Sequence, residues 1–187
     1  MGYRIAILDA DAQAPASQIA EVVVTAPLND LRGAEALARA SDVVTLDTEH
    51  VPSDILEQIE AITPVRPGAA VLEVVQDRLR QREFLDSHGL PQVPHAGVDS
   101  LDELRATAAR IGFPCVLKTR RWGYDGKGQA RADSPADLEE AWRTIGELPA
   151  VLESFITFDR EISALLARGL DGEIQFHPVA ENTHRRQ

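Results

Sequence analysis

The stretch K-T-R-R-W-G-Y-D-G-K-G-Q, residues 118–129, sets three glycines and four cations in an otherwise acidic chain. The apolar run at 115–118 predicts a strand before it, and the alternating residues 129–132 predict a second strand after it. A glycine-rich tip between two strands exposes backbone N–H groups that no ladder uses, and such groups form concavities that bind anions. We therefore expect a β-hairpin with a phosphate-binding tip; a plain glycine hairpin with solvated cations is the alternative.

This tip differs from the two common phosphate-binding motifs. It lacks G-x-x-x-x-G-K-[ST] and joins strand to strand, so it is not a P-loop, and it does not match the dinucleotide fingerprint. Its glycines predict a mobile lid that closes over phosphates and excludes water. Lys118, at the end of the first strand, would point a cation towards the same ligand.

The first 65 residues carry the pattern of an α/β sheet with parallel strands. The predicted strands are the apolar runs 5–8, 22–24 and 42–46, and the predicted helices follow residues 29–30 and 52–54. Ligands of such sheets bind outside the carboxyl ends of the strands. The polar cluster at 47–50 lies at such an end and is a candidate site, with a solvated loop as the equal alternative.

The remaining residues predict helices followed by an antiparallel arrangement. Helices are expected at 76–88 and from the capping-box pair Ser100 and Glu103 to Gly112, with an extended linker at 90–94 between them. A further helix carries Leu138, Trp142 and Ile145. The predicted strand 151–156 and a hairpin around 169–172 complete a β-β-α-β-β-β order.

The composition limits the classes of partner. The chain has 187 residues and a net charge of −11, so it repels nucleic acid and anionic membrane surfaces. A single cysteine, Cys115, excludes an internal disulfide and a cysteine-based metal cluster, and its apolar neighbours predict that it is buried. No apolar run reaches membrane-spanning length, and the first residues do not form a secretory signal, which predicts a cytoplasmic protein.

A series of motifs resembles the ATP-grasp superfamily and, within it, the N5-carboxyaminoimidazole ribonucleotide synthetases. The motifs are V-V-T-L-D-T-E-H-V-P at 43–52, Q-D-R at 76–78, L-K-T-R-R at 117–121, G-Y-D-G-K-G-Q at 123–129 and E-N-T-H-R at 181–185. The resemblance implies a mixed α/β and α+β fold. A partial Rossmann-like pre-ATP-grasp domain would span 1–65, a helical linker 66–114, and the lid subdomain with the start of the C-terminal sheet 115–187.

The resemblance also implies a reaction. ATP and bicarbonate would carboxylate 5-aminoimidazole ribonucleotide to N5-carboxyaminoimidazole ribonucleotide through carboxyphosphate, in de novo purine synthesis. The implied cofactors are ATP and Mg²⁺, and full-length members of the family are expected to be homodimers. Another ATP-grasp carboxylase or ligase, and a non-catalytic nucleotide-binding module, are the alternatives.

The resemblance assigns roles to individual residues. The ATP phosphates would be held by Arg78, Lys118, Gly123, Tyr124, Asp125, Gly126, Lys127, Gly128 and Gln129. The adenine-side strand would be Glu153, Ser154, Phe155 and Ile156, with Glu161 on the ribose and His184 near the nucleotide. Glu49, Tyr124 and Asp125 would face the aminoimidazole ribonucleotide. No residue of the chain is assigned to the metal, whose ligands are expected in a later segment.

The chain departs from the family pattern at both ends. The first strand, with its G-G-G-Q-L-G loop, and the segment after E-N-x-H-R do not occur in it. The predicted first sheet therefore lacks a central strand and has an unpaired edge. We expect a central fragment of the enzyme that is marginally stable and inactive as a carboxylase by itself.

Overall fold

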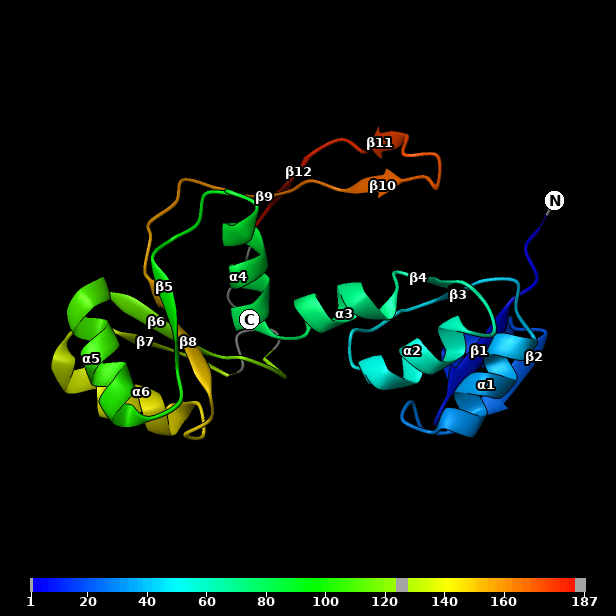
Figure 1. Ribbon diagram of the computed structural model, residues 1–187, viewed down its shortest axis with the longest axis horizontal. Helices are drawn as coiled ribbons and strands as arrows, with labels where there is room; N and C mark the ends of the chain where they lie inside the picture. The colour runs from blue at the N-terminus through cyan, green and yellow to red at the C-terminus, as the bar shows by residue number, and fades with distance from the viewer. Residues whose placement is uncertain (1, 124–127, 184–187) are drawn as a thin grey trace. The chain divides into compact units, whose positions relative to one another are not determined.

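The computed structural model describes residues 2–123 and 128–183 (Figure 1). The chain divides into two compact units, Met1–Ser154 and Phe155–Gln187. The predicted boundaries near residues 65 and 114 both fall inside the first unit and stay a prediction.

The first unit begins with short parallel strands and helices. Its elements are β1 (Ala6–Asp9), a 3₁₀ turn (Pro15–Gln18), β2 (Val22–Thr25), α1 (Leu31–Arg39), β3 (Val44–Thr45), α2 (Ser53–Glu60), β4 (Val65–Arg66) and α3 (Ala69–Val75). The two predicted strands that became β1 and β2 are confirmed within one residue, and they pair in parallel with Ala6 opposite Val22. The side chain of Asp30 caps α1 by accepting from the Gly33 N–H at 3.2 Å, as its position predicts.

The parallel strands form two separate pairs within the described residues, β1 with β2 and β3 with β4. The predicted strand 42–46 shrinks to two residues. Its partner β4 was predicted only as a boundary, because prolines flank its two residues and hide the strand signal. One apolar core serves α1, α2, α3, β3 and β4, and Leu8 of β1 packs against it. The helices therefore hold both strand pairs in one unit.

The second half of this unit is a helix followed by an antiparallel sheet with two covering helices. Its elements are α4 (Arg78–Ser87), β5 (His95–Val98), α5 (Leu101–Ile111), β6 (Cys115–Thr119), β7 (Gln129–Ala132), a 3₁₀ turn (Pro135–Asp137), α6 (Leu138–Thr144) and β8 (Ala150–Ser154). The strand order is β5-β8-β6-β7. The predicted hairpin is confirmed, with Lys118 opposite Gln129.

The two faces of this sheet carry different side chains. Cys115, Leu117 and Leu152 belong to a core that α5 and α6 cover, and Figure 1 shows these two helices side by side. Because strand residues alternate in direction, Lys118 and Glu153 point to the opposite face, which α4 approaches. The fold therefore sets two charged residues of the sheet under a helix.

Two helix starts differ in detail from the predicted ones. Ser100 accepts from the Glu103 N–H at 3.2 Å as expected, but the Glu103 carboxylate accepts from Asp99 at 2.8 Å rather than from Ser100. The helix predicted from residue 76 begins at Arg78, since Asp77 is its N-cap and accepts from the Leu79 N–H at 3.0 Å.

The second unit is built of short strand pairs. They are β9 (Glu161–Ser163) with β12 (Ala180–Asn182), and β10 (Leu166–Arg168) with β11 (Ile174–Phe176), all antiparallel. The β10–β11 pair confirms the predicted hairpin. None of the described side chains in this unit is buried, and Leu166, Leu170 and Phe176 are among its exposed apolar residues. No helix within the described residues is long and apolar enough to cross a membrane.

Candidate functional site

A cavity of about 210 Å³ lies between α4 and the sheet. Arg78, Gln81 and Arg82 line it from the helix, and Lys118, Gln129 and Glu153 line it from β6, β7 and β8. Arg78 and Arg82 are four residues apart and so share one face of the helix. Three cations, one carboxylate and two amides therefore converge on one volume, a composition suited to a polyanionic ligand.

The carboxylate of Glu153 is the centre of this cluster. Its residue is only 4% exposed. Oε1 accepts from Arg82 Nε at 2.9 Å and from Arg82 Nη2 at 2.7 Å, while Oε2 accepts from the Lys118 ammonium at 2.7 Å. Burial raises the pKa of Glu153, but the hydrogen bonds and charges of Lys118 and Arg82 outweigh it and hold the pKa below its ordinary value. Glu153 is therefore a buried anion compensated by two cations.

A second buried carboxylate, Asp77, ties the start of α4 to the root of the glycine loop. Besides capping the helix, it accepts from Arg120 Nε at 3.0 Å and Arg120 Nη2 at 2.7 Å. The Arg78 N–H donates to the Arg120 carbonyl at 2.9 Å, and Arg78 Nη2 donates to the Gly123 carbonyl at 3.0 Å. Burial raises the pKa of Asp77, but the Arg120 guanidinium and the backbone N–H groups of Arg80 and Leu79 together outweigh it and lower the net pKa. The loop root is thus fixed against the helix that lines the cavity.

The far root of the loop requires a glycine. Gly128 has a φ of +69°, and its carbonyl accepts from the Thr119 N–H at 2.8 Å. A Cβ built at this position would lie 2.6 Å from Thr119 Oγ1. Both the backbone conformation and the space therefore exclude a larger residue here without rearrangement.

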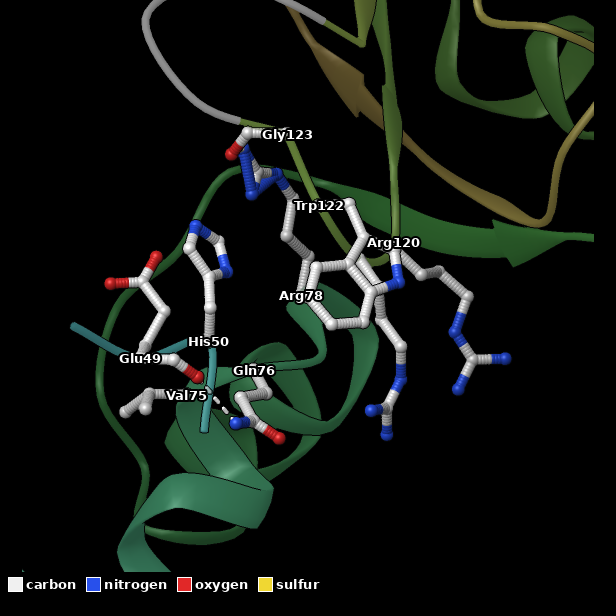
Figure 2. Close-up of a pocket in the computed structure, with 9 residues that line it drawn as sticks. Glu49, His50, Val75, Gln76, Arg78, Arg120, Trp122 and Gly123 are labelled. Atoms are coloured by element: carbon white, nitrogen blue, oxygen red, sulfur yellow. Dashed lines mark hydrogen bonds between the residues drawn. The ribbon is translucent and has the colours of Figure 1, made fainter. Parts of the chain in front are cut away.

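A smaller pocket of about 40 Å³ joins the polar cluster after β3 to the glycine loop (Figure 2). Glu49 and His50 line it from one side, and Arg78 and Trp122 from the other. Gln76 Nε2 donates to the backbone carbonyls of Glu49 and of Val51, which fixes the cluster against the α3–α4 junction.

An aromatic pair crosses this pocket. The rings of His50 and Trp122 are stacked, with centroids 5.5 Å apart and planes inclined by 26°. Trp122 adopts a φ of +65°, which is uncommon for a residue with a side chain. The sequence left open whether the 47–50 cluster is a site or a solvated loop. The cluster borders a pocket that Arg78 also lines.

The structure brings together some of the residues assigned from the sequence. Arg78, Lys118, Gln129 and Glu153 meet in the 210 Å³ cavity, and Glu49 and Gly123 line the smaller pocket with Arg78. Ser154 ends β8, with its N–H donating to Pro94 at 2.9 Å.

The remaining assigned residues belong to the second unit or lie outside the described residues. Phe155 and Ile156 open the second unit, and Glu161 begins its strand β9. Tyr124, Asp125, Gly126, Lys127 and His184 fall outside the described residues.

Several residues of the site were missed by the sequence reasoning. Arg82, Asp77 and Gln76 make contacts that hold the assigned residues in place. A signal for Arg82 was present: it follows Arg78 by four residues on a predicted helix, and Glu153 interrupts an apolar strand and needs a counter-charge. His50 lies in the polar cluster at 47–50 that the sequence marked as a candidate site, but Trp122 carried no such signal, because its stacking on His50 depends on the tertiary fold.

Comparison with known proteins places this geometry in a family. A model described as "ATP-grasp domain" matches residues 83–187, and one described as "Ribonucleotide synthetase preATP-grasp domain" matches residues 1–76. These matches confirm the predicted order of a pre-ATP-grasp domain followed by ATP-grasp structure.

Individual relatives agree with the family models. The chain is 37% identical over 98% of its length to the N5-carboxyaminoimidazole ribonucleotide synthase of Brucella melitensis. It superposes on the Staphylococcus aureus N5-carboxyaminoimidazole synthetase complexed with ADP with a TM-score of 0.94 at 30% identity, covering 99% of this chain and 50% of that one. The Aspergillus clavatus enzyme in complex with ADP and 5-aminoimidazole ribonucleotide gives 0.86 at 26% identity, covering 96% and 47%. The chain spans about half the length of the relatives it matches, including 51% of the Brucella protein.

Proposed function

This chain belongs to the ATP-grasp family, and we propose that it is part of an enzyme that carboxylates 5-aminoimidazole ribonucleotide with ATP and bicarbonate. The observation that carries the proposal is the cavity in which Arg78, Lys118 and Gln129 converge beside the root of the glycine loop. The product would be N5-carboxyaminoimidazole ribonucleotide, an intermediate of purine synthesis. Because the reaction consumes ATP, we place the enzyme in the cytoplasm.

The described residues suit the binding of nucleotide phosphates. Phosphoryl transfer from ATP to bicarbonate requires that negative charge on the phosphates be neutralised and that the reactants be held in line. The Lys118 ammonium and the Arg78 guanidinium line one cavity, and Arg78 also bonds the loop at Gly123. The lid predicted from the sequence for this glycine-rich stretch would exclude water from carboxyphosphate, and it stays a prediction because residues 124–127 lie outside the described residues.

The smaller pocket is the proposed place of the aminoimidazole ribonucleotide. Glu49 offers a carboxylate that can accept from the exocyclic amine, and Arg78, shared by both cavities, would link this substrate to the phosphates. The roles first assigned to Tyr124, Asp125, Glu161 and His184 stay predictions, as does the homodimer.

Mg²⁺ would help to neutralise the charge of the ATP phosphates in such a reaction. Within residues 2–123 and 128–183, no group of three His, Cys, Asp or Glu side chains gathers to hold a metal ion. We therefore assign no residue of this part of the chain to Mg²⁺.

Calorimetric titration of the chain with ATP and Mg²⁺ tests the nucleotide assignment. We expect binding that weakens by about tenfold or more in Lys118→Met, which removes one charge-assisted contact. Arg131→Met is the matched control, because Arg131 lies on the adjacent strand and pairs with Asp133 at 2.6 Å. Absence of binding at millimolar ATP would refute the nucleotide site.

The substrate assignment has its own test. The chain holds two tryptophans, and Trp122 lines the proposed substrate pocket while Trp142 is buried in the core. We expect aminoimidazole ribonucleotide, added in the presence of ADP, to change the tryptophan emission of the wild-type chain, and Trp122→Phe to abolish the change. An unchanged emission, together with no heat of binding, would favour a different ATP-grasp ligase.

A further inference from the structure

We propose that Arg82 is a positioning residue that allows Lys118 to leave Glu153 for a nucleotide phosphate. The inference rests on the proposed nucleotide site and adds to it a residue that contacts the carboxylate behind the binding lysine. It follows from how the two oxygens of Glu153 are shared between Arg82 and Lys118.

The two oxygens of Glu153 have different partners. Oε1 accepts both hydrogen bonds from Arg82, and Oε2 accepts the bond from Lys118 at 2.7 Å. The Lys118 side chain lines the cavity and is 27% exposed, whereas the Glu153 side chain is only 5% exposed. Lys118 can therefore turn towards a ligand in the cavity, but Glu153 cannot turn towards water.

Movement of Lys118 from Glu153 to a phosphate would cost free energy, because the buried Glu153 carboxylate would lose one of its two cations. If Lys118 moved to a phosphate and nothing else contacted Glu153, a carboxylate would be left buried without a counter-charge, which is strongly unfavourable. Arg82 prevents this because its two hydrogen bonds and its charge remain on Oε1. With Arg82 in place, the lysine loses one partner and gains another while the carboxylate stays compensated.

Arg82 is itself held independently of any ligand. Its Nη1 donates to Gln92 Oε1 at 3.0 Å, and Gln92 Nε2 donates to the Arg82 carbonyl at 2.8 Å and to Asp86 Oδ1 at 2.7 Å. These contacts hold Arg82 through Gln92, without any contribution from Lys118. Arg82 is thus the fixed partner of the carboxylate and Lys118 the exchangeable one.

The test measures ATP affinity by calorimetry for Arg82→Met, Arg82→Lys and the control Arg80→Met. Arg80 lies on the same helix, is 49% exposed and pairs only loosely with Glu73, at 3.7 Å. We expect Arg82→Met to weaken ATP binding by at least about tenfold, the factor of one lost charge-assisted interaction. Arg82→Lys should recover part of the loss because it keeps the charge, and Arg80→Met should leave the affinity unchanged. Thermal unfolding of each variant establishes that the titrations are made on folded protein.

A double-mutant cycle with Glu153→Gln separates this role from a direct effect of Arg82 on the phosphates. A neutral amide needs no counter-charge, so we expect Arg82→Met to weaken ATP binding by less than about threefold in the Glu153→Gln background. An equal loss in both backgrounds would mean that Arg82 acts on the phosphates directly and would overturn the inference. So would equal affinities of Arg82→Met and wild type. If the wild-type chain binds no ATP, the proposed nucleotide site fails and this inference fails with it, an outcome distinct from both.

Discussion

Replacement of Asp77 separates two jobs that one buried carboxylate performs. Asp77 is 3% exposed, caps α4 and receives two hydrogen bonds from Arg120. Asp77→Asn keeps an acceptor for the cap, since Asn and Asp are comparable N-caps, but removes the charge opposite Arg120. Asp77→Ala removes both. The difference between the two variants therefore reports the cap, and the loss in Asp77→Asn reports the ion pair.

The expected magnitudes follow from the contacts. Hydrogen bonds to a charged group contribute about 1.5–3 kcal/mol, but the Arg120 side chain is 27% exposed and regains part of this from water. We expect Asp77→Asn to lower the free energy of unfolding by about 1–2 kcal/mol. Loss of the cap adds about 1 kcal/mol, which gives about 2–3 kcal/mol for Asp77→Ala. At roughly 3 °C per kcal/mol for a unit of this size, the Tm falls by about 3–6 °C and 6–9 °C.

The assay is thermal unfolding followed by circular dichroism between pH 7 and pH 2.5. Because the pKa of Asp77 is lowered in the folded protein, its stabilisation is fully present above the unfolded pKa, about 3.9. It disappears as the pH falls through the lower folded pKa, so the gap between wild type and Asp77→Asn must close there. Asp102→Asn, at a 93% exposed position in the first turn of α5, is the control and should cost less than about 0.5 kcal/mol. Equal losses in Asp77→Asn and Asp102→Asn, or a gap that does not close in acid, would refute the reasoning.

Three further predictions concern single positions. In urea unfolding, Gly128→Ala should lower the free energy of unfolding by more than Gly89→Ala does. Both positions have a positive φ, which costs an alanine about 1–2 kcal/mol, but of the two only position 128 lacks space for a Cβ; equal costs would contradict this. Because the pKa of Glu153 is lowered in the folded protein, its contribution is fully present above the unfolded pKa of about 4.3, and the stability gap between Glu153→Gln and wild type should narrow as the pH falls below that value; a gap that stays constant in acid would contradict this. Trp142 is a buried core residue, so Trp142→Ala should lower the free energy of unfolding in a denaturant titration by about 3–5 kcal/mol. Trp122 is 69% exposed, so Trp122→Ala should lower it far less; the reverse order would contradict the assignment of Trp142 to the core.

The sequence predicted the elements whose signal is local. The β6–β7 hairpin follows from alternation around three glycines, and α1 and α5 follow from their caps at Asp30 and Ser100. The strands β4 and β5 have two and four residues and depend on partners distant in the chain, so periodicity could not reveal them. The helix α3 was missed because its valine-rich, almost wholly apolar residues A-A-V-L-E-V-V show no amphipathic repeat and Gly68 offers no side-chain cap.

The candidate site divides in the same way. Lys118 stood out because a cation at the end of a strand is conspicuous in an acidic chain, whereas Arg78 was assigned only by the resemblance to ATP-grasp proteins. Arg82 and Asp77 did not stand out, because in the sequence they resemble ordinary helix residues. Their roles depend on the fold, which buries both the Glu153 carboxylate that Arg82 contacts and the carboxylate of Asp77 itself. The resemblance to ATP-grasp proteins supplied roles for residues, and the structure supplied the contacts between them.

The strand order β5-β8-β6-β7 has a consequence for the folding of this chain during its synthesis on the ribosome. The strand β8, at Ala150–Ser154, lies between β5 and β6, yet it is the last of the four to be synthesised. The β6–β7 hairpin can form as it emerges, but β5 must wait for about 50 more residues before β8, its one neighbour in the sheet among the described residues, exists. At ordinary translation rates this wait lasts roughly 3–10 s. During that interval the nascent chain presents an open strand edge, and binding by a chaperone would shield it best then.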